Sequence, residues 1–162
     1  MNLDELYAKL VIKKGINLKK GEEVFINSSV ETADFARKLC ACAYENGAKK
    51  VIVNYTDEQI TLLKLMHEEK ETLEKIDAWQ IAQKDYIPDN RCAYINILSS
   101  NPDAYSNADG EKLTALSLAQ RIAIRNFTIR ARATNSSGIL SAIHRKSGLI
   151  RLWESATTRL KS

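Results

Sequence analysis

A turn rich in hydroxyl and amide groups, Asn27–Glu31, has the residue types and the position that come nearest to a ligand site. It follows a short run of strand-forming residues, Val24–Ile26, and precedes a helical pattern, which is where open α/β sheets bind their ligands. The turn lacks the glycines of a phosphate-binding loop, because Gly15 and Gly21 lie between a helix and a strand rather than between a strand and a helix. We therefore expect a serine of this turn to cap the following helix.

The cysteines and histidines do not form a metal-like pattern. Cys40 and Cys42 are two positions apart on an expected helix, so their side chains point to different faces, and we expect both to be small buried apolar groups. His67 is followed by Glu68 and Glu69, but neighbouring residues of a helix diverge, whereas a metal ion needs ligands that converge. No serine or cysteine triad is evident from the spacing. From the residues alone we assign no catalytic, cofactor-binding or metal-binding residue.

The periodicity of the apolar residues predicts alternating strands and helices. In chain order the expected elements are a helix at 4–14, a strand at 24–26, a helix from 29 to 46, a strand at 49–55, a helix at 56–68, a charged helical stretch at 69–85 broken before Pro88, a strand at 92–98 and a helix at 111–126. The fold class is therefore α/β, a mostly parallel sheet with helices on its faces in βαβαβα order, followed by an irregular basic tail. The expected core includes Val24, Ile26, Val51, Val53, Tyr94, Ile95 and Ile97.

The composition is that of a globular protein. Its 162 residues suffice for one buried core, and 44% hydrophobic with 27% charged residues are ordinary values for such a domain. No apolar run approaches the roughly 20 residues that cross a bilayer, and the acidic N-terminus does not resemble a signal peptide. Three cysteines without a disulfide-like pattern fit a reducing compartment. We therefore expect a cytoplasmic protein with no membrane partner.

Charge divides the chain near residue 120. Residues 1–120 hold 15 basic and 19 acidic side chains, whereas residues 121–162 hold nine basic side chains and one acid, Glu154. Four of the basic residues recur at helical spacings and can neutralise phosphates, namely Arg121, Arg125, Arg130 and Arg132. A small non-catalytic module that uses the basic tail on nucleic acid or acidic surfaces is therefore an alternative. Because the tail lacks clustered aromatic residues for base stacking, nucleic acid is not our expected partner.

Several motifs over residues 1–125 resemble, in their order, the aminopeptidase T, aminopeptidase S and PepS family of bacterial metalloaminopeptidases. The matching segments are Gly15-Ile16-Asn17, Gly21–Ile26, Val30-Glu31-Thr32-Ala33, Ala43-Tyr44, Gly47-Ala48, Val51–Val53, Asp57-Glu58 with His67, and the loop residues Ser99, Pro102, Asp109 and Lys112. Their order over this length makes the resemblance specific.

The resemblance implies a homodimeric exopeptidase that removes N-terminal residues from peptide substrates with two divalent metal ions (cobalt, zinc or magnesium). In the family, the metal ligands lie in the C-terminal half of a chain more than twice as long as this one. Residues 1–125 resemble the non-catalytic N-terminal α/β domain, so no catalytic residue can be carried over, and His67 is not among the family's ligands. We expect this N-terminal fragment to bind no metal ion and to be inactive on its own.

The sequence departs from the family between about Arg125 and Asn135, where the charge balance also changes. We interpret residues 126–162 as a divergent basic tail and favour a frameshifted or truncated gene over a divergent basic arm, because likeness and charge change together. Apart from a short strand or turn at 139–143, the tail lacks a sustained apolar period. We therefore expect poor packing from about residue 131 onward, an exposed Trp153, and first trypsin cuts at Arg130, Arg132, Arg145 or Lys146.

Overall fold

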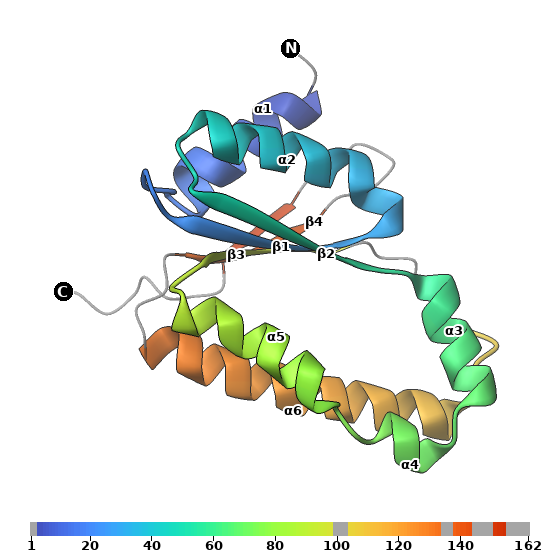
Figure 1. Ribbon diagram of the computed structural model, residues 1–162. Helices are drawn as coiled ribbons and strands as arrows, with labels where there is room; N and C mark the ends of the chain where they lie inside the picture. The colour runs from blue at the N-terminus through green and yellow to red at the C-terminus, as the bar shows by residue number, and fades with distance from the viewer. Residues whose placement is uncertain (1–2, 99–103, 134–137, 144–150, 155–162) are drawn as a thin grey trace. The chain divides into compact units, whose positions relative to one another are not determined.

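The computed structural model describes residues 3–98, 104–133, 138–143 and 151–154, and the chain divides into two compact units (Figure 1). The first unit comprises Met1–Thr56, Arg91–Ser100 and Ser136–Ser162 and contains the sheet. The second unit comprises Asp57–Asn90 and Asn101–Asn135 and is helical. Among the described residues, no helix is both long enough and apolar enough to span a membrane.

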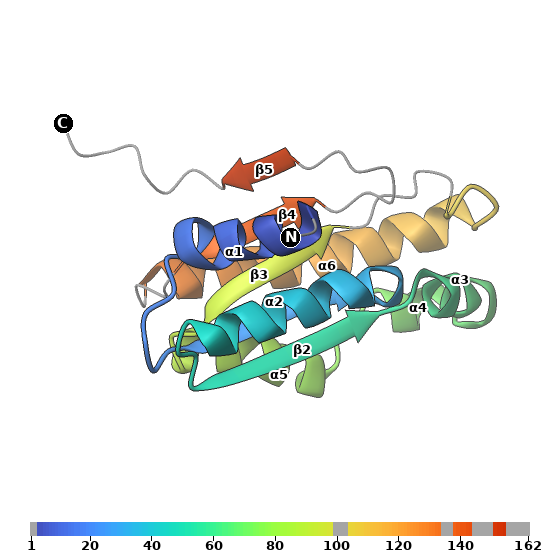
Figure 2. The ribbon, with the colours of Figure 1, turned by 90° about the horizontal axis from the view of Figure 1, so that it is seen from above.

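The sheet of the first unit has five strands in the order β2-β1-β3-β4-β5 (Figure 2). The strands are β1 (Glu23–Ser29), β2 (Lys50–Thr56), β3 (Ala93–Leu98), β4 (Ile139–Ile143) and β5 (Arg151–Glu154). Strand β1 pairs in parallel with β2 and β3, β3 pairs in parallel with β4, and β5 runs antiparallel to β4. The mostly parallel α/β sheet predicted from the β-branched and aromatic runs is confirmed.

One face of the sheet is covered by α1 (Leu3–Leu10), the short π-helix η1 (Val11–Gly15) and α2 (Ala33–Glu45), which follows the single-turn helix η2 (Val30–Thr32). The aromatic ring of Tyr7 on α1 stacks on that of Phe35 on α2, with 5.3 Å between the ring centroids. The Nζ of Lys38 lies 2.9 Å from a carboxylate oxygen of Asp4, so an ion pair also joins the two helices.

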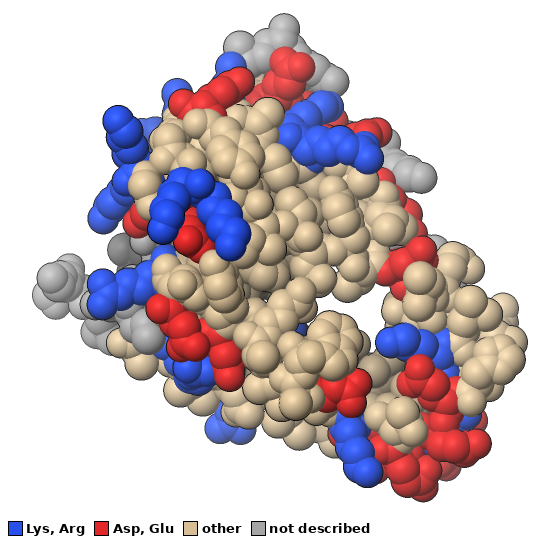
Figure 3. Space-filling model, viewed as in Figure 1, with Lys and Arg blue, Asp and Glu red and all other residues tan. Residues whose placement is uncertain are grey.

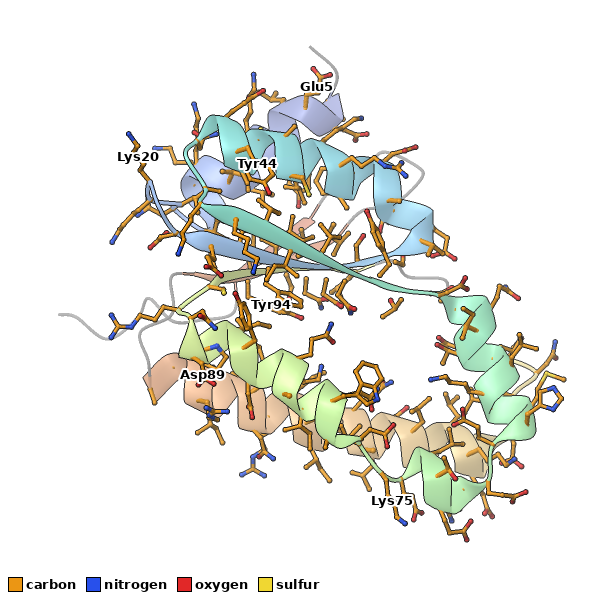
Figure 4. The ribbon with its side chains drawn as sticks, viewed as in Figure 1. Glu5, Lys20, Tyr44, Lys75, Asp89 and Tyr94 are labelled. Carbon is orange, nitrogen blue, oxygen red and sulfur yellow. The ribbon has the colours of Figure 1, made fainter. Side chains whose placement is uncertain are left out.

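The predicted core is largely confirmed. Four of its members are buried (Val24, Ile26, Ile95 and Ile97), and Val51 and Val53 pack against them half-buried. Tyr94 is the exception, because side chains alternate along a strand and its neighbour Ile95 faces the core. The Tyr94 ring points to the opposite face of the sheet from α2 (Figure 4), where its centroid lies 6.1 Å from that of Phe25.

The second unit consists of α3 (Glu58–His67), α4 (Lys70–Leu73), α5 (Ala78–Asp89) and α6 (Gly110–Ala133). Its buried apolar side chains come from all four helices, among them Leu65, Leu73, Ile87 and Phe127. The predicted break before Pro88 is wrong, since α5 continues through Pro88 to Asp89. A proline in the last turn removes a single intrahelical hydrogen bond, and Asn90 caps the helix directly after it, with its side-chain amide donating to the carbonyl oxygen of Tyr86 (2.9 Å).

Two predictions about the tail are wrong for the described residues. Helix α6 does not end near Asn126 but continues to Ala133, and packing does not fail at residue 131, because Ala131, Leu140 and Ala142 are all buried. Poor packing was expected because the tail's own apolar residues are too few to offset the entropy cost of ordering it. This expectation did not count the open edge of β3, which supplies both hydrogen-bond partners and an existing core. The side chain of Trp153 lies outside the described residues.

A close backbone approach fixes the start of β4. Gly138 has φ +52°, and a Cβ atom at this position would lie 2.9 Å from the Cα of Ile16. On the other side of the same contact, a Cβ on Gly15 would lie 2.8 Å from a methyl group of Leu140. The position of Gly138 therefore requires glycine, whereas a Cβ at Gly15 would require the Leu140 side chain to shift; β4 packs tightly on the segment around the end of η1.

Candidate functional site

A row of asparagine side chains crosses the sheet toward the carboxyl ends of its strands. Asn54 of β2, Asn27 of β1 and Asn96 of β3 occupy one register line, and all three are half-buried. The side-chain Nδ2 of Asn54 donates to Oδ1 of Asn27 (2.8 Å), and Nδ2 of Asn27 donates to Oδ1 of Asn96 (2.9 Å). Ser141 of β4 is next in the same line. The row is a hydrogen-bonded amide ladder that locks the register of three parallel strands.

Sequence reasoning missed this ladder, although a signal was present. Each strand carries the same short pattern, an aromatic or aliphatic residue, then a β-branched residue, then asparagine: Phe25-Ile26-Asn27, Ile52-Val53-Asn54 and Tyr94-Ile95-Asn96. Because β1, β2 and β3 pair in parallel, equal positions in the three patterns meet in one row. Chemically, the amides can orient a polar group, but neutral amides supply neither a nucleophile nor a general base.

The turn after β1 is built as a helix cap. The hydroxyl groups of Ser28 and Ser29 lie 2.8 Å and 3.1 Å from the hydroxyl oxygen of Thr32, and all three residues are buried. The backbone N–H of Ser29 also donates to the Thr32 hydroxyl, which completes a reciprocal capping box at the start of η2. The prediction that a serine of Asn27–Glu31 caps the helix is confirmed. These hydroxyls are engaged with one another rather than with a base.

The cysteines are weakly acidic thiols, of which Cys42 and Cys92 are buried and Cys40 is half-buried. Burial raises the pKa of Cys40 and of Cys42 on α2, as expected for side chains that act as small apolar groups. Cys92, directly before β3, is fully buried, and its Sγ lies 3.9 Å from a carboxylate oxygen of Glu23. Burial and the negative charge of Glu23 raise the pKa of Cys92 to about 11. A thiol with such a pKa stays protonated at neutral pH and is a poor nucleophile.

The histidine predicted to lie at a solvated helix end does so. His67 is the last residue of α3 and is exposed, and Glu68 follows as the C-cap in an extended conformation. His144 lies outside the described residues. Within the described ranges, no three His, Cys, Asp or Glu side chains come together as metal ligands. The described residues therefore do not fit a two-metal centre.

Comparison with known proteins identifies a family to which this chain is similar. A model of the thermophilic metalloprotease family M29 matches residues 2–142. The chain belongs to the M29 family. The resemblance predicted for residues 1–125 is thereby confirmed, and the family match continues beyond it through most of β4.

The M29 relatives include aminopeptidases from several bacteria. Aminopeptidase AmpS of Bacillus subtilis is 33% identical over 121 residues, which cover 75% of this chain and 30% of AmpS. Aminopeptidase PepS of Streptococcus thermophilus is 29% identical over 154 residues, or 95% of this chain and 37% of PepS. The solved structure of wild-type AmpT from Thermus thermophilus superposes with a TM-score of 0.72 at 29% identity, covering 80% of this chain and 32% of AmpT. The chain thus spans about a third of the length of these M29 relatives.

Proposed function

We propose that the part of this chain matched by the M29 family, residues 2–142, forms the N-terminal α/β domain of a two-metal aminopeptidase and that this polypeptide has no peptidase activity on its own. The observation that carries the proposal is the M29 match over residues 2–142, combined with the spans of 30% and 37% that the chain covers in AmpS and PepS. Two divalent ions, when bound in such an enzyme, activate water and polarise the scissile carbonyl. The described residues offer no ligand set for that chemistry.

The role we assign to this domain is architectural. Its sheet is fixed by the amide ladder of Asn27, Asn54 and Asn96, and its turn after β1 is fixed by buried hydroxyl groups. Such a rigid layer suits a domain that lies beside a catalytic domain and shapes access to it. For the complete enzyme we propose peptides with a free N-terminus as substrates, cobalt, zinc or magnesium as the metal, a homodimer and a cytoplasmic location.

The proposal is tested with arylamide substrates. Purified chain incubated with cobalt, zinc or magnesium should release no more arylamine from Leu- or Arg-arylamides than the metal ions alone. The matched control is His67→Ala, because His67 is the one histidine among the described residues and is exposed. Metal-dependent turnover that His67→Ala abolishes would show that the second unit contains a catalytic site after all.

For the tail, we propose that the likeness to the family continues well past Asn135, because the match to PepS takes in 95% of this chain. Leu140 and Ala142 are buried in the core, and β4 pairs with β3 over five consecutive residues from Tyr94–Ile139 to Leu98–Ile143. A randomly shifted reading frame is not expected to supply a strand that fits in this way. A frameshift between Arg125 and Asn135 is therefore not favoured. Reading the downstream nucleotide sequence in all three frames tests the truncated-gene explanation, and an absence of family-like sequence there would remove it.

A further inference from the structure

The outward face of α6 carries a seam of five residues, which we call the α6 seam: Leu118, Ile122, Arg125, Ile129 and Arg132. They alternate at spacings of four and three, the spacings of a and d positions in a heptad, which keep one stripe of a helix facing a neighbouring helix. The three aliphatic side chains are 56%, 54% and 57% exposed, and both arginines are exposed as well. Aliphatic and guanidinium groups thus share one uncovered stripe.

Buried residues beside and opposite the α6 seam hold the helix in place. Ala115 and Ala119 border the seam, and Phe127 and Ala131 lie on the opposite face. The guanidinium of Arg130 pairs with the carboxylates of Asp85 and Asp89 on α5, with 2.8 Å between Nη2 of Arg130 and Oδ1 of Asp89. Figure 4 labels Asp89 on the last turn of α5. Because the fold of this unit does not depend on the α6 seam, the seam is a preformed surface, and preformed surfaces lose less entropy on binding.

Every charged side chain of α6 after Lys112 is an arginine. Helix α6 has no acidic residue after Glu111, and Arg121 lies one turn before Arg125. Within the described part of the chain, Arg121, Arg125 and Arg132 form no ion pair, whereas Arg130 does. Figure 3 shows a group of acidic side chains of the same unit around α4. An occupant of the α6 seam must therefore bring carboxylates to meet the exposed guanidinium groups.

We propose that the α6 seam binds an acidic amphipathic helix of a partner protein. The partner's aliphatic side chains pack between Leu118, Ile122 and Ile129, and its carboxylates pair with Arg125 and Arg132. The seam covers four turns, about 21 Å at 1.5 Å per residue, so a partner helix of three heptads, about 31 Å long, spans it with roughly one turn beyond each end. Charged residues at two of five seam positions specify the register and the sign of the partner.

Two other classes of occupant fit the α6 seam less well. A helix face that lies in a membrane surface needs a broad apolar stripe with the arginines to its sides, but here the arginines interrupt a narrow stripe that has no aromatic residue. A nucleic acid would pair with the arginines and leave the three exposed aliphatic side chains in water, with no aromatic ring for a base to stack on.

The binding test uses the full chain and two synthetic peptides of three heptads. The acidic peptide repeats Glu-Ile-Ala-Ala-Leu-Glu-Lys, and the basic peptide repeats Lys-Ile-Ala-Ala-Leu-Lys-Glu, so that they differ in charge but share the aliphatic spacing. Fluorescence anisotropy of the labelled peptides should show binding of the acidic peptide at least about tenfold tighter than that of the basic peptide, with an affinity that falls as salt rises. No binding of the acidic peptide at about 100 µM, or equal binding of both peptides, overturns the proposal.

Matched variants locate the binding surface. The double variant Arg125→Glu/Arg132→Glu should weaken binding of the acidic peptide about tenfold or more. The control Lys64→Glu/Lys75→Glu makes the same change in net charge at exposed residues elsewhere in the unit, and it should change the affinity less than about twofold. Ile122→Gln should weaken binding without changing its salt dependence. Equal losses in the two double variants would overturn the proposal. The proposal would also be overturned if Arg125→Glu/Arg132→Glu bound the acidic peptide as before but lost affinity for phosphatidylserine vesicles or for single-stranded RNA.

Discussion

Substituting Gly138 by alanine perturbs the contact on which the packing of β4 depends. The residue has φ +52°, a conformation that costs a residue with a Cβ roughly 1–2 kcal/mol. The new Cβ would also lie 2.9 Å from the Cα of Ile16 and 3.0 Å from its carbonyl oxygen, which are backbone atoms and cannot rotate away. Overpacking of this kind costs roughly 1–3 kcal/mol. We therefore expect Gly138→Ala to lower the free energy of unfolding by roughly 2–5 kcal/mol.

Gly21→Ala is the matched control. Gly21 has φ +88°, but a Cβ there would meet no atom within 4 Å. This variant should lose only the conformational part, roughly 1–2 kcal/mol. Both variants are compared with the unaltered chain by urea unfolding, followed by circular dichroism at 222 nm, and by the rate of trypsin cleavage. If Gly138→Ala is no less stable than Gly21→Ala, β4 is not packed against the segment at Ile16. The prediction of a poorly packed tail would then be correct.

Two further predictions concern individual side chains. Arg130→Gln should destabilise the helical unit by about 1 kcal/mol at low salt, because one guanidinium pairs with both Asp85 and Asp89, and this loss of stability should shrink at high salt. The control Arg125→Gln breaks no ion pair among the described residues and should leave the stability unchanged in the same urea titration. Equal losses of stability in the two variants would contradict the assignment of these ion pairs. For Cys92, a pKa of about 11 in the folded chain against 9.0 otherwise means that its contribution to stability is fully present below pH 9 and is lost as the pH rises toward 11. The shift corresponds to roughly 1–3 kcal/mol. Cys92→Ala should lose this part of the pH dependence, and an unchanged alkaline slope would refute it.

The elements with a strong local signal could be predicted from the sequence. The β-branched runs around Val24–Ile26 and Val51–Val53 gave the parallel strands, and the serines after β1 gave the cap. The face that Tyr94 takes could not be predicted, because an almost continuous apolar strand does not show which side each residue points to. The helix through Pro88 was missed because the cost of proline depends on how many residues of the helix follow it.

The features that join distant segments could not be predicted in the same way. Strand β4 is stabilised by its neighbour β3 and by two glycines that let the backbone come close, so residues 139–143 alone do not show that they form a strand of the core. The ion pairs of Arg130 connect residues 41 and 45 positions apart, and no local pattern marks them. For the site, the absence of a convergent ligand set was an expectation from spacing, and the family came from ordered motifs rather than from any one residue.

The metal stoichiometry of the purified chain tests the central claim most directly. The chain is dialysed to equilibrium against zinc or cobalt, the bound metal is measured by mass spectrometry, and the cobalt form is examined for the visible absorption bands of ions held by imidazole and carboxylate ligands. If this polypeptide is the N-terminal domain of an M29 aminopeptidase without the metal centre, no stoichiometric ion should remain bound and the cobalt spectrum should be that of the hydrated ion. Two tightly bound ions per chain, with a cobalt spectrum of protein ligation, would contradict the claim.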